Sequence, residues 1–181
     1  MMGQLEVSTV LLQPLETALA PATTAPVVVQ DYFKKNAGVR FSTVFAEFKH
    51  RFFDRTERPA AAATYRKHKL LVIADDARIL GELGGGTKVE GTLAAAFAFL
   101  QHQPKGEAGF LQTNGYANLF YMRDKKGELC AIRISWTSQG WEFDAIPVAD
   151  PLAWIGEHVI ICPEQPIHGG GLQFLGRSTF A

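Results

Sequence analysis

The chain has 181 residues, of which 47% are hydrophobic and 20% are charged. This length favours a single domain, and the composition is ordinary for a globular protein, which excludes a collagen, a coiled-coil rod and a wholly disordered chain. The 18 basic and 18 acidic residues cancel, so the net charge of the whole chain points to no class of partner.

The first 68 residues are predicted to form an arm followed by helices. Residues 1–25 contain prolines and repeated Ala and Thr without periodicity, which is typical of an N-terminal arm or linker. Residues 26–68 are predicted to be helical, in three pieces over 27–35, 43–55 and 60–66. Ser42 is the expected N-cap of the second helix. The apolar face of that helix is predicted to consist of Phe41, Val44, Phe45, Phe48 and Phe52.

The next segment combines a strand with two helices. A continuous apolar run over 69–74 predicts a buried strand, and Asp75 and Asp76 are placed to cap a helix over 77–83. Thr92 is the expected cap of a helix that extends to about residue 102. This helix is apolar on most of its surface, which indicates that it packs on more than one side.

Residues 116–148 show the clearest pattern, which is that of an antiparallel meander. Three strands are predicted over 119–123, 129–136 and 141–148, separated by turns that end in Gly127 and Gly140. A further strand is expected over 159–162. The predicted fold class is therefore α+β, with a helical N-terminal segment and a C-terminal antiparallel β-meander packed against the apolar helix.

The expected organisation is one domain with short appendages. The domain covers 26–162, with its helical part over 26–68, its strand and helix part over 69–103 and the meander over 116–162. A flexible tail is expected over 163–181, which contains three consecutive glycines.

The compartment is predicted from the cysteines and the N-terminus. Cys130 and Cys162 lie in apolar, strand-like runs, which favours two buried, reduced thiols; a disulfide between them stays open if their strands are adjacent. The segment before a signal-like Ala-Leu-Ala at 18–20 has no basic residue and contains Glu6 and Glu16. No apolar run reaches the roughly 18 residues of a membrane-spanning helix. We therefore expect a cytoplasmic protein with no membrane partner.

No sequence motif points to catalysis. The five histidines lack the spacing of a zinc site, and no Ser or Cys lies in a nucleophile motif, so we expect no metal and no cofactor. An enzyme hypothesis rests on a composite site of the carboxylates Asp75, Asp76, Glu142 and Asp144. The simpler interpretation is that the first two cap a helix and the last two lie on the solvated face of a sheet.

Three tryptophans, Trp136, Trp141 and Trp154, lie within nineteen residues of one another. Trp136 and Trp141 flank a predicted turn and are expected to pair across the strands. The three rings are candidates for the lining of a ligand cleft. The alternative is a core pair, with the third ring closing the edge of the sheet.

The strongest functional lead is a local charge excess. Residues 34–69 contain ten basic and three acidic residues, which is a surplus of seven positive charges. This surplus favours an anionic partner, and the succession of short helices allows a helix-turn-helix variant that binds nucleic acid. The expected contact residues are Lys49, Arg51, Arg55, Arg66 and Lys67. The same residues are equally suited to dock on an acidic surface of this chain or of a neighbour.

The sequence thus predicts a small, non-enzymatic binding or interaction module whose partner is a protein or a second copy of the chain. Two alternatives stay open: a nucleic-acid-associated protein that uses residues 34–69, and an enzyme with the composite carboxylate site. An interaction module predicts an exposed apolar surface. Nucleic-acid binding predicts strong salt dependence, and an enzyme predicts convergent carboxylates with raised pKa values.

Overall fold

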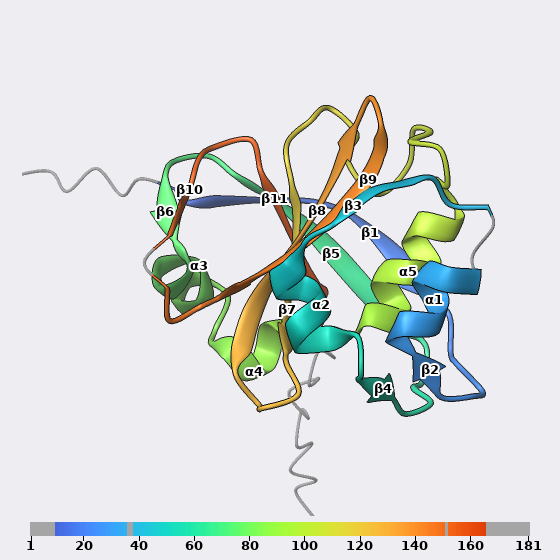
Figure 1. The fold of residues 1–181 in the computed structure, drawn as a ribbon. Coiled ribbons are helices and arrows are strands. Elements are labelled where there is room, and N and C mark those ends of the chain that lie inside the picture. The colour runs from blue at the N-terminus through green and yellow to red at the C-terminus, as the bar shows by residue number, and fades with distance from the viewer. Residues whose placement is uncertain (1–9, 36–37, 151, 166–181) are drawn as a thin grey trace, which may run out of the picture.

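A mixed seven-stranded sheet organises the chain. The computed structural model describes residues 10–35, 38–150 and 152–165, to which all structural statements below refer (Figure 1). The strand order is β1 (Leu12–Ala20), β5 (Ala63–Leu70), β11 (Val159–Pro163), β7 (Asn118–Arg123), β8 (Leu129–Thr137), β9 (Gly140–Pro147) and β3 (Phe41–Val44). Pairing is parallel between β11 and β7 and between β3 and β9, and antiparallel elsewhere.

The sheet separates two apolar clusters, because successive side chains of a strand point to opposite faces. In β8, Ile132 and Ile134 belong to the first cluster and Ala131 to the second. The first cluster is rich in aromatic rings and is covered by three helices, α1 (Val29–Lys35), α2 (Ala46–Phe52) and α5 (Leu93–Gln101) (Figure 1). Phe48, Phe97 and Phe143, from two of these helices and β9, pack together there.

The second cluster is covered by smaller elements. Here lie α3 (Asp76–Glu82) and a two-stranded ribbon of β6 (Ala74–Asp75) and β10 (Ala153–Trp154), at the left of Figure 1. The short helix α4 (Gly86–Val89) contributes Val89 to the same cluster. A second two-stranded ribbon pairs β2 (Val27–Val28) with β4 (Thr56–Glu57) beside α1.

The predicted fold class is wrong. The N-terminal part begins with a strand rather than with helices, and the strands of the expected meander are not a separate C-terminal sheet. Strands β7, β8 and β9 do pair antiparallel in sequence order, but β11 flanks them on one side and β3 on the other, both in parallel pairing. The sheet is therefore mixed, and it includes segments from both ends of the described chain.

Three local predictions fail because tertiary pairing overrides local propensity. Residues 12–20, expected within an arm, form the edge strand β1, whose Pro14, Glu16 and register shift are features that discourage pairing with another chain. The alanine-rich piece at 60–66 runs into β5, which is paired on both sides. Ser42 lies in β3, and α2 begins after Phe45 without a side-chain cap.

Other local predictions are confirmed. Thr92 accepts a hydrogen bond from the Ala95 N–H at the start of α5, and Asp75 accepts one from the Arg78 N–H at the start of α3. Gly127 and Gly140 both have positive φ in the two hairpin turns. The predicted tail at 163–181 lies outside the described residues beyond Gln165.

Candidate binding cleft

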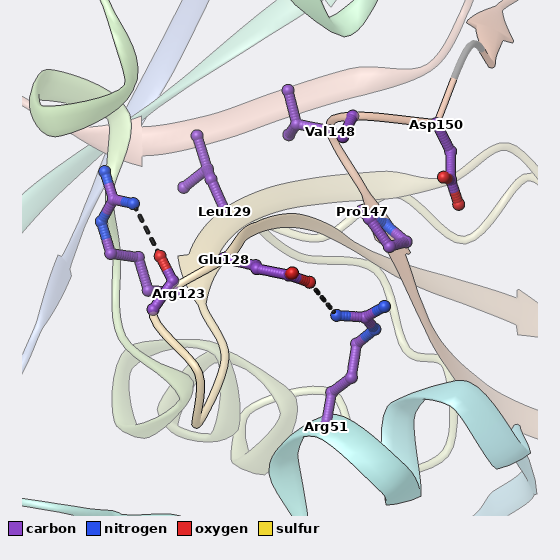
Figure 2. A pocket seen from close by; sticks show the side chains of 9 residues that line it. Arg51, Arg123, Glu128, Leu129, Pro147, Val148 and Asp150 are labelled. Carbon is purple, nitrogen blue, oxygen red and sulfur yellow. Dashed lines mark hydrogen bonds and ion pairs between the residues drawn. The ribbon is translucent and has the colours of Figure 1, made fainter.

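A cleft lies where β7, β8 and β9 reach one end of the sheet, and we call it the Arg51 cleft (Figure 2). Its volume is about 640 Å³, against about 210 and 280 Å³ for two smaller ones. One wall is the β7–β8 turn, another is the segment that leaves β9, and α2 contributes a single arginine. The lining residues are Arg51, Arg123, Gly127, Glu128, Leu129, Pro147, Val148, Ala149 and Asp150.

Arg51 holds the turn that forms one wall. Its guanidinium donates hydrogen bonds to Glu47 at 2.6 Å and to Asp124 and Glu128 at 2.7 Å each. The Asp124 side chain is only 1% exposed, and its other oxygen accepts the N–H groups of Lys126 and Glu128. Arg51 thus links the turn to α2, and the Asp124 carboxylate holds the backbone of the turn in place. The wall is therefore formed before any ligand binds.

This network shifts the pKa values of its members. The Glu128 and Glu47 carboxylates raise the pKa of Arg51, against the opposing effect of burial. Burial alone would raise the pKa of Asp124, but the hydrogen bonds from Arg51 and the turn N–H groups outweigh it, and that pKa lies below its ordinary value. Both groups are therefore charged across the physiological range.

The floor of the cleft is apolar and its rim is charged. Leu129 and Val148 form the floor together, joined by a 2.9 Å hydrogen bond from the Val148 N–H to the Leu129 carbonyl. At one side, Arg123 bonds Glu90 at 3.2 Å and the Gly127 carbonyl at 2.9 Å. At the other side, Asp150 is exposed, and its carboxylate has no hydrogen bond or ion pair within the described ranges (Figure 2).

The five basic residues expected to bind nucleic acid do not form one surface. Arg51 lies in the cleft bound to three carboxylates; Arg66 pairs with Glu164, and Lys67, which is buried, pairs with Glu16. Arg66 and Lys67 are neighbours in β5 and point to opposite faces of the sheet. Lys49 and Arg55 have no ion pair among the residues that the structure describes, and Arg55 lies over the Phe52 ring. Three of the five expected contact residues are thus paired with carboxylates within the fold.

The three tryptophans do not line one cleft. Trp136 and Trp141 are directly opposite each other in β8 and β9, with ring centroids 5.3 Å apart in an edge-to-face arrangement. Trp141 is fully buried, and its indole N–H donates to the Gln103 carbonyl at 2.9 Å. Trp154 lies in β10, on the other face of the sheet, where it packs in the second cluster. The first two are a core pair.

Three of the four carboxylates of the enzyme hypothesis have separate partners, and none is found for Glu142 among the described residues. Asp75 caps α3, and Asp144 lies 3.7 Å from the Arg133 guanidinium. Asp76 is 2% exposed; its Oδ1 accepts hydrogen bonds from Tyr121 at 2.5 Å and Trp154 at 2.8 Å, while its buried Oδ2 has no partner in the described part of the chain. Burial raises the pKa of Asp76. No hydrogen bond or ion pair within the described ranges joins Asp76 to Glu142 or Asp144.

The cleft combines residues that sequence reasoning did not single out. Of its lining, only Arg51 was a candidate, as a contact for nucleic acid or for an acidic protein surface. Arg123, Glu128 and Asp150 lie 72 residues or more from Arg51 in the sequence. No local signal distinguishes them from ordinary surface charges, because the cleft exists only once α2 packs beside the end of β9.

Exposed apolar side chains gather around the β6–β10 ribbon. Of seven large hydrophobic side chains that are exposed in the described residues, five are close to the β6–β10 ribbon: Val10, Leu71, Ile73, Leu152 and Ile155. The Leu71 N–H bonds the Leu11 carbonyl, and the register of the ribbon sets Ile73 opposite Ile155. We call these five residues the apolar end.

Neither the metal-ligating side chains and helices of the described residues nor the comparison with known proteins assigns a function. Within residues 10–35, 38–150 and 152–165, no three His, Cys, Asp or Glu side chains are grouped so as to hold a metal ion. In the same ranges, no helix has the length and apolar character needed to cross a bilayer. Comparison of the chain with family models, curated proteins and solved structures finds no match.

Proposed function

We propose that this protein is a small, non-enzymatic interaction module that holds a segment of a partner protein in the Arg51 cleft. The carrying observation is that the Arg51 cleft, the largest of the three compared above, has an apolar floor and a wall fixed in advance by Arg51 and Asp124. Its volume of about 640 Å³ lies within the range of ligand-binding clefts. A preformed wall spares the ordering of a loop on binding, which favours affinity.

A protein partner is favoured over a small molecule by the openness of the site. Gly127, Glu128, Ala149 and Asp150, all at the rim, are exposed to solvent, so a small ligand would stay largely uncovered. The exit segment that carries Asp150 also continues within two residues to Leu152 of the apolar end. A partner chain that follows this segment would bury apolar surface beyond the cleft, as protein interfaces do.

Nucleic-acid binding has weaker support. Phosphate recognition requires cations that are available to the ligand. Three of the five predicted contacts, Arg51, Arg66 and Lys67, are already engaged by carboxylates.

The free cysteines Cys130 and Cys162 support a reducing compartment, so we propose that the partner is a cytoplasmic protein.

The test is selection from a random peptide library displayed on phage, with a blocked variant as counter-selection. Ala149→Trp places a large ring in the cleft at an exposed position, and Ala62→Trp is the matched control, exposed and outside the cleft. We expect recovered peptides to bind the wild type and the control, and to bind the Ala149→Trp variant at least about tenfold more weakly. Peptides that bind all three proteins equally, or a selection that enriches nothing, would overturn the proposal.

A further inference from the structure

The charges in and around the Arg51 cleft do not balance. Arg123 is matched by Glu90, but Arg51 faces Glu47, Asp124 and Glu128, and Asp150 stands at the rim without a cation. The groups that line the cleft, with the carboxylates bound to them, therefore carry an excess of three negative charges. Of the two lysines on the β7–β8 turn, Lys125 is paired with Asp54, and Lys126 does not line the cleft.

Two carboxylates of this excess are accessible to a ligand. Glu128 is 57% exposed even though it bonds Arg51, so one face of its carboxylate remains open to solvent. Asp150 is exposed at the other end of the cleft, and Figure 2 shows Pro147 between its carboxylate and the Arg51 guanidinium. Leu129, Pro147 and Val148 give the same cleft its apolar lining, and Figure 2 shows Pro147 between the two carboxylates. A ligand in the cleft would thus meet apolar surface with a negative charge at either side.

We infer that the cleft selects a cationic group on an apolar stem, and that its natural form is a Lys or Arg side chain of the partner protein. The inference rests on the proposed function and adds the chemistry that the partner must present. A lysine or arginine side chain carries three or four methylene-like carbons before its charge, so the stem covers apolar surface while the head stays near carboxylates and water. Three of the five N–H groups of Arg51, on Nε and Nη1, are already directed to three carboxylates, which favours a cation over an anion as the ligand of this cleft.

The test uses three six-carbon probes with different head groups: hexylammonium, hexanol and hexanoate. Each is titrated into the full chain labelled with ¹⁵N, and the amide signals of Gly127, Leu129, Val148 and Ala149 are followed. We expect saturable shifts with hexylammonium, weaker ones with hexanol and none with hexanoate. Asp150→Asn should weaken hexylammonium binding about threefold to fivefold, since it removes the one carboxylate of the rim that has no internal cation. Glu82→Gln, an exposed carboxylate outside the cleft, is the matched control and should change nothing.

Salt supplies a second readout of the charge. Raising the ionic strength from about 0.02 M to about 0.5 M should reduce the affinity for hexylammonium and leave that for hexanol unchanged, because only the charged probe is screened. Equal shifts with hexanol and hexylammonium, or stronger shifts with hexanoate, would overturn the inference.

The outcome separates this inference from the proposed function. Selected peptides that bind in the cleft without enrichment of Lys or Arg would remove the charge selectivity and leave the interaction module standing. Selective binding of hexylammonium together with a failed peptide selection would remove the interaction module and leave the charge selectivity of the cleft standing. Small free amines as the natural ligand would show as tight hexylammonium binding that no peptide of the selected pool can displace.

Discussion

The carboxylate of Asp76 accepts a hydrogen bond from the indole N–H of Trp154, 78 residues further along the chain. The same oxygen accepts the hydroxyl of Tyr121. One carboxyl oxygen thus ties α3 and the β6–β10 ribbon to the centre of the sheet. The other oxygen is buried without a partner in the described residues, which makes the charged form of Asp76 costly.

The first prediction concerns this carboxyl group and pH. Its folded-state pKa is raised by burial above the unfolded value, so its contribution to stability is complete below the unfolded pKa and is lost as pH rises through the folded pKa. We expect the wild type to lose stability from this group as pH rises above the unfolded pKa, and Asp76→Asn, which keeps the accepting oxygen, to lose less. Urea unfolding at about pH 4 and at about pH 8 measures both.

Asp76→Ala serves as the second variant at this site. It leaves the buried hydroxyl of Tyr121 and indole N–H of Trp154 without an acceptor, which should cost about 2–5 kcal/mol at either pH. A pH dependence that is identical in the wild type and in Asp76→Asn would show that Asp76 does not bind a proton on folding.

The second prediction has the opposite sign of pH dependence. The folded-state pKa of Asp124 is lowered, so the stability it contributes is present above the unfolded pKa and is lost as pH falls through the folded value. Arg51→Met leaves this buried carboxylate without its cation, and we expect a loss of about 2–4 kcal/mol near pH 7 that shrinks towards pH 3. Thermal or urea unfolding across this range is the measurement.

A double variant checks that the loss comes from the pair. Adding Asp124→Asn to Arg51→Met keeps the acceptor for the turn N–H groups and removes the unpaired charge, so part of the stability should return. If the double variant is as unstable as the sum of the two single variants, the ion pair is not what stabilises the turn.

A third prediction compares two glycines in equivalent hairpin turns. Gly140 has φ of +138°, and a Cβ at this position would lie 2.7 Å from the Arg40 carbonyl oxygen, just before β3, and 2.9 Å from the Ser42 backbone nitrogen, in β3. Gly127 has φ of +83° and open space around it. Gly140→Ala should therefore cost about 2–4 kcal/mol and displace β3, whereas Gly127→Ala should cost only about 1 kcal/mol. Similar losses of stability in the two variants would mean that β3 can shift to make room for the new Cβ at little cost.

The fourth prediction concerns the two thiols. Cys130 and Cys162 are buried in different apolar clusters on strands separated by β7, and burial raises the pKa of each thiol to about 11. At about pH 8 roughly one thiol in a thousand is ionised, and neither is accessible. We expect a thiol-reactive dye to label none in the native protein and two after unfolding in the absence of reductant. One labelled thiol or none after unfolding would indicate that oxidation or another modification has occurred.

The predictions that are confirmed rest on local signals. The helix after Thr92 and the hairpin turns at Gly127 and Gly140 follow from capping, periodicity and turn chemistry, which act within a few residues. The strand at 159–162 was also expected, but not its place between β5 and β7. Which strands pair with each other depends on residues far apart in the chain, so no short stretch of the sequence reveals it.

The failures share one cause. The exposed edge strand β1 and the alanine-rich start of β5 have little apolar alternation, because partial exposure relaxes the choice of residue. The expected strand at 69–74 ends early, and Leu71 and Ile73 are exposed at the apolar end instead of buried. The Arg51 cleft was out of reach for the same reason as the sheet order, since it joins α2 to turns 73 or more residues away.

The position of β11 sets an order on how the molecule can assemble during synthesis. β11 is the last strand along the described chain, yet it lies between β5 and β7 and joins the β1–β5 pair to the remaining four strands. Until residues 159–163 leave the ribosome, the two halves of the sheet have no strand in common, and the inner edges of β5 and β7 are unpaired. We therefore expect the sheet to close only after nearly the whole described chain has been made, with those two edges open to other nascent chains in the interval.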